Sequence, residues 1–483
     1  MIKFLFGSLV VWTVFLSAAH GQPRNCKEIL WGHSSLDTLQ SIPYQKKTIS
    51  LDHLFEKRGF VTVPLDYDRP QGPQIEVFYR VFPTFDEVKT GVRNSEAPLL
   101  VAINGGPGMP SKTFRSYDFN YSNIENFDPF TNRIGYLSKY FRIIAIDQRG
   151  TDGYSAPLDM SHPNIRPEIV AQYFKAEEVA LDHAQVISKL IPEGVEFYML
   201  GQSYGGAPLM RYLMDDRVLR KPKRAIFASA VIPGLDTMNS SVARREEQRQ
   251  LNLQLKEAYP DIDQLLGQLK EKFVALALNE SNIHSLWYYL GRGKKGDWEK
   301  NFLKTVHEML EMDRPQMEKF LSTGHGEVEL LNYILSSSML TPGFTDRSMV
   351  PELMQRVPYE PWMIDEFQAI TQLSADTPQW LHEMVDEIDQ NPPPGGRVDD
   401  TELAKRVFSD LGRVFFSFGE NDNAVPAEES MAVARRMNVP GVTQFGYFPG
   451  GHSAAFGEEG SLGIYNWTQN LETFPDVDQV PVP

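Results

Sequence analysis

The sequence predicts an α/β fold, a mostly parallel central sheet with helices on both faces and an inserted helical cap. Short apolar runs recur in the first half of the chain, at 99–103, 141–146, 197–200 and 225–232. Helical stretches such as 168–190 separate several of them, and strands that alternate with helices build parallel sheets. No strand-like run stands out from about 238 to 390, and strand character returns at 414–419 and 443–448. A helical segment therefore interrupts the sheet.

This pattern divides the chain into four parts. Residues 1–21 predict a signal peptide, because Lys3 precedes an apolar stretch and small residues that suit cleavage. Residues 22–236 and 399–483 are the two parts of the α/β core, and 237–398 are the helical cap. The apolar stretch is too short to span a membrane. We expect an exported protein, periplasmic or secreted, without a stable membrane anchor after signal cleavage.

The composition indicates a folded globular protein and disfavours nucleic acid as a partner. A hydrophobic share of 42% in 483 residues is typical of a folded globular chain. The net charge of −16 disfavours nucleic-acid binding, because such a surface repels phosphates. Cys26 is the single cysteine, so no intramolecular disulfide forms. The sequence does not specify the oligomeric state.

Ser203 is the first candidate for chemistry. It lies in the pattern G-x-S-x-G, Gly201 to Gly205, between an apolar run and a helical stretch. A nucleophile on a strand-to-helix elbow requires this context, since glycines on either side avoid clashes with the neighbouring strand and helix. An ordinary glycine-rich turn is the alternative.

A base and an acid follow Ser203 in the order of the α/β-hydrolase fold. Asp422 comes just after the run 414–419, with Glu420 as a rival for the acid. His452 follows the last run, in a loop with two glycines before it. The spacing favours Asp422 and His452 as partners of Ser203.

An oxyanion hole completes the expected site. The run 99–103 leads into Asn104-Gly105-Gly106-Pro107-Gly108, where glycines leave backbone N–H groups unobstructed. We expect the N–H groups of Gly106 and Tyr204 to form the hole. No metal is expected, because the His-Glu pairs at 307–308 and 382–383 lack the second histidine of a zinc motif. No other cofactor is expected, because the sequence contains neither a P-loop nor a dinucleotide-binding fingerprint.

The stretches "NGGPG" (104–108), "DQRGTDGYSAP" (147–157) and "GQSYGG" (201–206) resemble the prolyl aminopeptidase (proline iminopeptidase) family of α/β-hydrolase serine peptidases, in particular its larger members. The stretch 59–82 is similar to the family's N-terminal hairpin, and 257–266 to a cap helix. The resemblance covers most of 50–456. It implies release of an N-terminal residue, preferably proline, from peptides through an acyl-enzyme.

The resemblance also implies how substrate binds. Cap carboxylates of the family hold the free α-amine, and Glu329 and Glu383 fall on the matching positions. A buried amine requires such carboxylate partners. The partners are therefore peptides with a free N-terminus.

The chain departs from the family at three places. Asp152 adds a residue to the usual R-G-x-G-x-S, Asn104 replaces the usual His or Gln, and "FASAVIPG" lacks the Gly-Gly before the cap. A tripeptidyl or dipeptidyl aminopeptidase, an esterase or lactonase of the same fold, and a binding module without activity remain alternatives.

Overall fold

The computed structural model describes residues 57–84, 86–87, 94, 96–106, 136–150, 173, 176–231, 237–291, 297–321, 357, 359–365 and 401–480. The predicted signal peptide, Glu329 and Glu383 lie outside these residues, as does most of 322–400. Among the described residues, no helix has the length and apolar character to cross a membrane.

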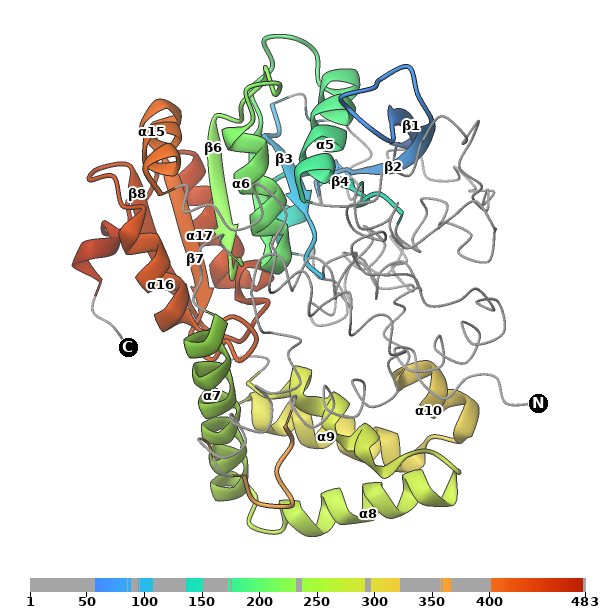
Figure 1. Cartoon of the computed structure of the whole chain (residues 1–483). Coiled ribbons are helices and arrows are strands. Elements are labelled where there is room, and N and C mark those ends of the chain that lie inside the picture. The colour runs from blue at the N-terminus through green and yellow to red at the C-terminus, as the bar shows by residue number, and fades with distance from the viewer. Residues whose placement is uncertain are drawn as a thin grey trace.

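One eight-stranded sheet organises the described chain (Figure 1). Its strands are β1 (Lys57–Pro64), β2 (Gln74–Phe82), β3 (Leu99–Ile103), β4 (Arg142–Ile146), β5 (Tyr198–Gln202), β6 (Arg224–Ala228), β7 (Val414–Gly419) and β8 (Thr443–Phe448). Their order is β1-β2-β4-β3-β5-β6-β7-β8. The pairs β1–β2 and β2–β4 are antiparallel and all others are parallel. This confirms the predicted mostly parallel sheet.

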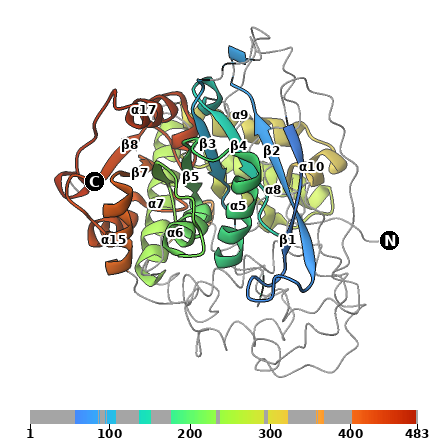
Figure 2. The same cartoon turned by 90° about the horizontal axis from the view of Figure 1, so that it is seen from above.

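Alternate strand residues enter two separate hydrophobic layers. Val101 and Ile103 of β3 join a core with helices α5 (Ala176–Leu190), α6 (Gly206–Met214), α15 (Thr401–Leu411) and α16 (Ala427–Arg436). Leu100 and Ala102 face the opposite layer, which contains Trp467 of α17 (Glu458–Thr468). Figure 2 shows α17 and the α5–α6–α15 group on opposite sides of the strands. Burial on both faces explains why these strands are continuous apolar runs.

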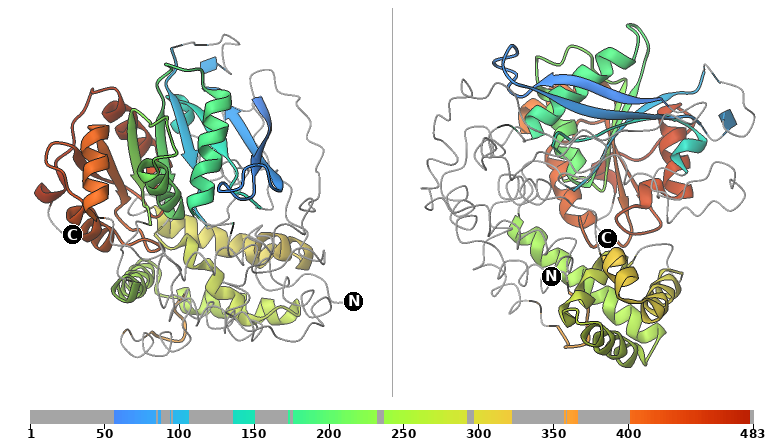
Figure 3. Two further views of the ribbon diagram at one scale, coloured as in Figure 1. Left: turned by 45° about the horizontal axis from the view of Figure 1, so that its top comes forward. Right: turned by 90° about the vertical axis from the view of Figure 1, so that its right-hand side faces the viewer.

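A helical insertion lies between β6 and β7, beyond the carboxyl ends of the parallel strands (Figures 1 and 3). We call its described elements the inserted helices: α7 (Thr237–Ala258), α8 (Ile262–Ala275), the 3₁₀ helix η6 (Glu280–Tyr289), α9 (Trp298–Glu311) and α10 (Arg314–Leu321). They share a hydrophobic core of their own, which includes Leu251, Phe273, Trp298 and Met309. The described part of the predicted cap is thus mostly helical, with irregular structure at 357 and 359–365, and its boundaries at 237 and 398 stay predictions.

Two element boundaries differ from those that the sequence pattern indicates. The apolar run 225–232 continues beyond β6, but the strand stops at Ala228 because Ser229 has a φ of 45°. The stretch 257–266, expected to be one cap helix, contains the end of α7 and the start of α8. Pro260 stands in this junction, where its missing N–H cannot continue a helix.

A buried ion pair joins the edge of the sheet to its helical layer. Arg149, fully buried after β4, donates from Nε and Nη2 to the two carboxylate oxygens of Asp182 on α5, at 2.7 and 2.6 Å. Its other N–H groups donate to the carbonyl oxygens of Pro64, Leu65 and Tyr173. Every guanidinium N–H therefore has an acceptor, the condition under which a buried charge is tolerated.

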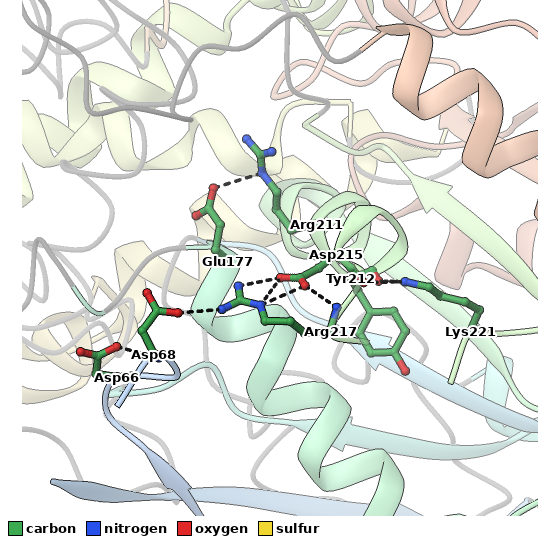
Figure 4. A network of polar contacts seen from close by, with 8 residues as sticks. All are labelled: Asp66, Asp68, Glu177, Arg211, Tyr212, Asp215, Arg217 and Lys221. Atoms are coloured by element: carbon green, nitrogen blue, oxygen red, sulfur yellow. Dashed lines mark hydrogen bonds and ion pairs between the residues drawn. The ribbon is translucent and has the colours of Figure 1, made fainter. Parts of the chain in front are cut away.

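A second arginine makes similar contacts at the surface. Arg217 donates from Nε and Nη2 to Asp215 at 3.0 and 2.7 Å, and it reaches Asp68 at 3.4 Å (Figure 4). Its side chain is 52% exposed. Water screens such a pair, so we expect it to stabilise the fold far less than Arg149 does.

These two arginines give a matched test of burial. Arg149→Met leaves the Asp182 carboxylate buried without its partner, and we expect it to lower the free energy of unfolding by roughly 3–5 kcal/mol. Arg217→Met should lower it by less than about 1 kcal/mol. Urea unfolding followed by tryptophan fluorescence measures both, and equal losses in the two variants would contradict this role of Arg149.

Candidate active site

Ser203 stands on a strained turn between β5 and α6. Its φ is 55°, a left-handed conformation that a residue with a side chain seldom adopts. Gly201 and Gly205 allow the turn: a Cβ on either would come within 2.4 Å of a backbone oxygen, that of Gly205 or of Ile103. The carbonyl of Ser203 accepts a hydrogen bond from Val231 N at 2.8 Å. The surrounding backbone thus holds Ser203 in a conformation that costs of order 1–3 kcal/mol.

Asp422 and His452 meet at the ends of β7 and β8. The Nδ1 atom of His452 lies 3.0 and 3.1 Å from the two carboxylate oxygens of Asp422. The buried Asp422 also accepts from the backbone N–H groups of Ala424 and Val425, at 3.0 and 2.9 Å. Glu420, the rival acid, has an exposed side chain. The contact with Asp422 makes Nδ1 the protonated nitrogen and leaves Nε2 as the available base.

The two loops that carry this pair lie directly against each other. Glu420 N donates to the carbonyl of Phe448, and Asn421 N donates to that of Gly450. A Cβ on Gly419 would lie 2.2 Å from the carbonyl oxygen of Gly451. The glycine that ends β7 is therefore required by the close approach of the histidine loop.

Gln202 links Ser203 to the histidine loop. The side-chain amide of Gln202 donates to the carbonyl oxygen of His452 at 3.3 Å. The contacts of the described residues contain no direct hydrogen bond between the Ser203 hydroxyl and the His452 ring. Such bonds are often long before substrate binds. Ser203, Asp422 and His452 follow the ends of β5, β7 and β8, and β6 lies between β5 and β7 in the sheet.

The loop after β3, which begins with Asn104 and Gly105, also lies close to Ser203. A Cβ on Gly105 would lie 2.7 Å from the Cβ of Ser203, so only glycine fits there. Gln148 donates from Nε2 to the carbonyl oxygens of Asn104 and Gly105, at 2.8 and 3.0 Å. Gly106 follows with a φ of 116°. Pro107 and Gly108 lie outside the described residues.

Tyr204, the second expected donor to the oxyanion hole, follows Ser203 in the 3₁₀ turn η5 (Ser203–Gly205) that leads into α6. Its side chain is buried against Ala176 and Ala207, which fixes the backbone next to Ser203. A helix start presents unpaired N–H groups to an anion. Gly106 and Tyr204 therefore belong to the two segments that flank Ser203.

The inserted helices also contact the loop of Asp422. Asn423, the next residue, donates from Nδ2 to the carbonyl of Trp287 on η6 at 2.9 Å and accepts from Gln248 of α7 at 3.4 Å. Gly291 has a φ of 68°, and a Cβ there would lie 2.9 Å from the carbonyl oxygen of Asn421. These contacts, like those of Gln148 and Gln202, were missed by sequence reasoning, because glutamine, asparagine and glycine in a loop carry no signal of a distant partner.

The carboxylates expected to hold an amine lie outside the described residues, but one other carboxyl is close to the site. Burial raises the pKa of Glu247, on α7, to about 7, and the negative charges of Asp422 and Glu246 add to the rise. No group of His, Cys, Asp and Glu side chains among the described residues is arranged to hold a metal ion.

Gly291 tests whether the inserted helices support the site. Gly291→Ala places a Cβ against Asn421 at a positive φ, so we expect a loss of at least about 1 kcal/mol in stability and a slower reaction of Ser203 with a fluorophosphonate. Gly267→Ala on α8 is the matched control. Apart from the backbone of its own helix, no atom lies within 4 Å of the Cβ position of Gly267, and alanine in a helix should raise stability by about 0.5–1 kcal/mol. Identical behaviour of the two variants would exclude a supporting role for Gly291.

No protein-family model and no curated protein matches the chain. The solved structures that are similar to most of it include homoserine O-acetyltransferase from Staphylococcus aureus (14% identity, TM-score 0.44, 87% of this chain and 98% of that chain), esterase E22 (13%, 0.40, 86% and 99%) and a proline iminopeptidase-related protein from Thermus thermophilus (14%, 0.33, 86% and 96%). Likenesses at this level assign neither a family nor an activity. The strand order and the strained elbow are those of the α/β-hydrolase fold, which this chain has.

Proposed function

We propose that the protein is a serine hydrolase in which Ser203 is the nucleophile, His452 the general base and Asp422 the residue that orients the imidazole. The observation that carries the proposal is the strained Ser203 elbow beside the Asp422–His452 pair. A left-handed serine costs stability, and such strain persists where surrounding structure enforces it, often at functional sites. The same arrangement supports the oxyanion role of the Gly106 and Tyr204 N–H groups.

The mechanism is acyl transfer in two steps. Ser203 Oγ attacks the carbonyl carbon while Nε2 of His452 accepts its proton, and the Gly106 and Tyr204 N–H groups stabilise the oxyanion. His452 returns the proton to the leaving amine as the C–N bond breaks. Water then attacks the acyl-enzyme with His452 again as base, which releases the acid and restores Ser203. Asp422 keeps the proton on Nδ1 and stabilises the imidazolium.

We further propose that the substrate is a peptide with a free N-terminus, and that the residue released is preferably proline. The support is the resemblance of the "NGGPG", "DQRGTDGYSAP" and "GQSYGG" stretches to prolyl aminopeptidases. On this proposal Glu329 and Glu383 hold the substrate's α-amine, and the signal-like residues 1–21 direct export.

Removal of the Ser203 hydroxyl tests the nucleophile. Ser203→Ala should lower kcat by about 10³-fold or more and abolish covalent labelling by a fluorophosphonate. Ser229→Ala is the matched control, because Ser229 also follows a strand with a positive φ, and its buried hydroxyl has no hydrogen-bond partner. Retained labelling in the Ser203 variant, measured by intact-protein mass, would contradict the mechanism.

A panel of substrates tests the specificity. We expect hydrolysis of Pro-arylamide that is lost when the proline nitrogen is acetylated, because acetylation removes the charge that Glu329 and Glu383 would bind. Glu329→Gln and Glu383→Gln should each raise KM for Pro-arylamide and leave hydrolysis of a p-nitrophenyl ester nearly unchanged. Cleavage of Ala-Ala-Pro-arylamide alone would indicate a tripeptidyl aminopeptidase. Activity on the ester alone would contradict the peptidase proposal and indicate an esterase.

A further inference from the structure

Gln148 and Ser203 lie on opposite sides of the loop after β3. In the sheet, β3 stands between β4 and β5. Gln148 comes just after β4, and Ser203 directly follows β5. The loop is close to both of them. The carbonyl oxygen of Gly105 accepts a hydrogen bond from Gln148 Nε2 at 3.0 Å, and a Cβ on Gly105 would lie 2.7 Å from the Cβ of Ser203.

The contact with Gln148 fixes the direction of the Gly106 N–H group. The carbonyl of Gly105 and the N–H of Gly106 belong to one peptide unit, and in a trans peptide these two groups point in opposite directions. The carbonyl oxygen faces Gln148, on the β4 side of the loop. The Gly106 N–H therefore faces the β5 side, where Ser203 and Tyr204 begin the turn into α6.

The preceding peptide unit, between Asn104 and Gly105, is fixed at both of its polar groups. Its carbonyl accepts from Gln148 Nε2 at 2.8 Å, and its N–H donates to the side-chain oxygen of Asn104 at 2.9 Å. A side-chain amide has two N–H donors, so Gln148 has one for each carbonyl. Among the contacts of the described residues, only Gln148 donates to the Gly105 carbonyl, and no group accepts from the Gly106 N–H. The unit between Gly105 and Gly106 is therefore fixed by Gln148 alone.

Glycine on both sides makes this second unit easy to reverse. Gly106 has a φ of 116°, and glycine has access both to this value and to the negative φ of a reversed unit. A reversed unit would direct the Gly105 carbonyl toward the β5 side, where its oxygen would repel an oxyanion on Ser203. Reversal would also remove an acceptor from the buried Gln148 amide, which is unfavourable. Gln148 thus favours the orientation that suits catalysis.

We propose that Gln148 is a positioning residue, which selects the peptide orientation in which the Gly106 N–H can bind the oxyanion. This inference rests on the proposed serine hydrolase mechanism and deepens it. Gln148 touches neither the substrate nor Ser203 in this role. It sets the fraction of molecules in which the oxyanion hole has both of its donors, and so it acts on the transition state rather than on substrate binding.

Gln148→Met tests the proposal, because methionine has a similar volume and no N–H donor. We expect the rate constant for fluorophosphonate labelling of Ser203, and kcat for a p-nitrophenyl ester, to fall by about ten- to hundredfold. The KM for the ester should change by less than about threefold, since the oxyanion forms in the transition states of both acylation and deacylation and not in the bound substrate. A wild-type labelling rate in folded Gln148→Met would overturn the proposal.

Gln444→Met is the matched control. Gln444 is also a buried glutamine, and its side-chain oxygen accepts from Trp467 Nε1 at 2.5 Å. It lies near the start of β8, whereas His452 follows the end of that strand. We expect Gln444→Met to lower Tm and to keep the wild-type labelling rate. An equal loss of labelling in the two variants would assign Gln148 a merely structural role and contradict the proposal.

A crystal structure of the wild-type protein after fluorophosphonate labelling tests the geometry without any variant, and it decides the matter if Gln148→Met does not fold. We expect the phosphonyl oxygen within hydrogen-bond distance of the backbone nitrogens of Gly106 and Tyr204, with Gln148 Nε2 still on the Gly105 carbonyl. A Gly105 carbonyl turned toward the adduct, or a Gln148 side chain apart from it, would show that the inference is wrong.

Failure of this inference can be distinguished from failure of the proposed function. If the fluorophosphonate does not modify Ser203 in the wild type, the proposed mechanism is wrong. If it modifies Ser203 and Gln148→Met reacts as fast as the wild type, only the role of Gln148 is wrong.

Discussion

The left-handed backbone of Ser203 is the constraint on which the rest of the site depends. A residue with a side chain adopts this conformation only where its surroundings enforce it. Gly201 and Gly205 permit the contacts between turn and backbone, and Gly105 permits the next loop to reach the serine. The turn also brings the chain from β5 directly into α6. The strand, the helix and the adjoining loop are therefore built around one strained residue.

Polar contacts at the strand ends connect this residue to the other groups of the site. Gln202 joins the serine turn to the histidine loop, and Gln148 holds the loop that leads to Gly106. Each uses a side-chain amide to satisfy backbone carbonyls that the sheet leaves unpaired. These hydrogen bonds fix the positions of the two loops. Backbone groups near Ser203 therefore need less reorganisation during a reaction.

The inserted helices contact the loop that carries Asp422. Gln248, Trp287 and Gly291 contact the residues on either side of Asp422. The acid of the candidate site is thus held by the core on one side and by the insertion on the other. Glu247 lies at this junction, and its raised pKa is a consequence of it.

The sequence by itself determined the α/β fold and the strands β3, β7 and β8, because buried parallel strands are apolar runs bounded by turn residues. It also singled out Ser203, Asp422 and His452, since each directly follows such a run. Tertiary structure alone decided where β6 ends: Ser229 still donates to the Ser417 carbonyl of β7, but its φ of 45° turns the chain out of the strand. It also brought Asp422 into contact with Nδ1 of His452, and it placed Gln148 and Glu247. These features depend on contacts between segments far apart in the chain. The local sequence pattern does not indicate which distant segments will meet.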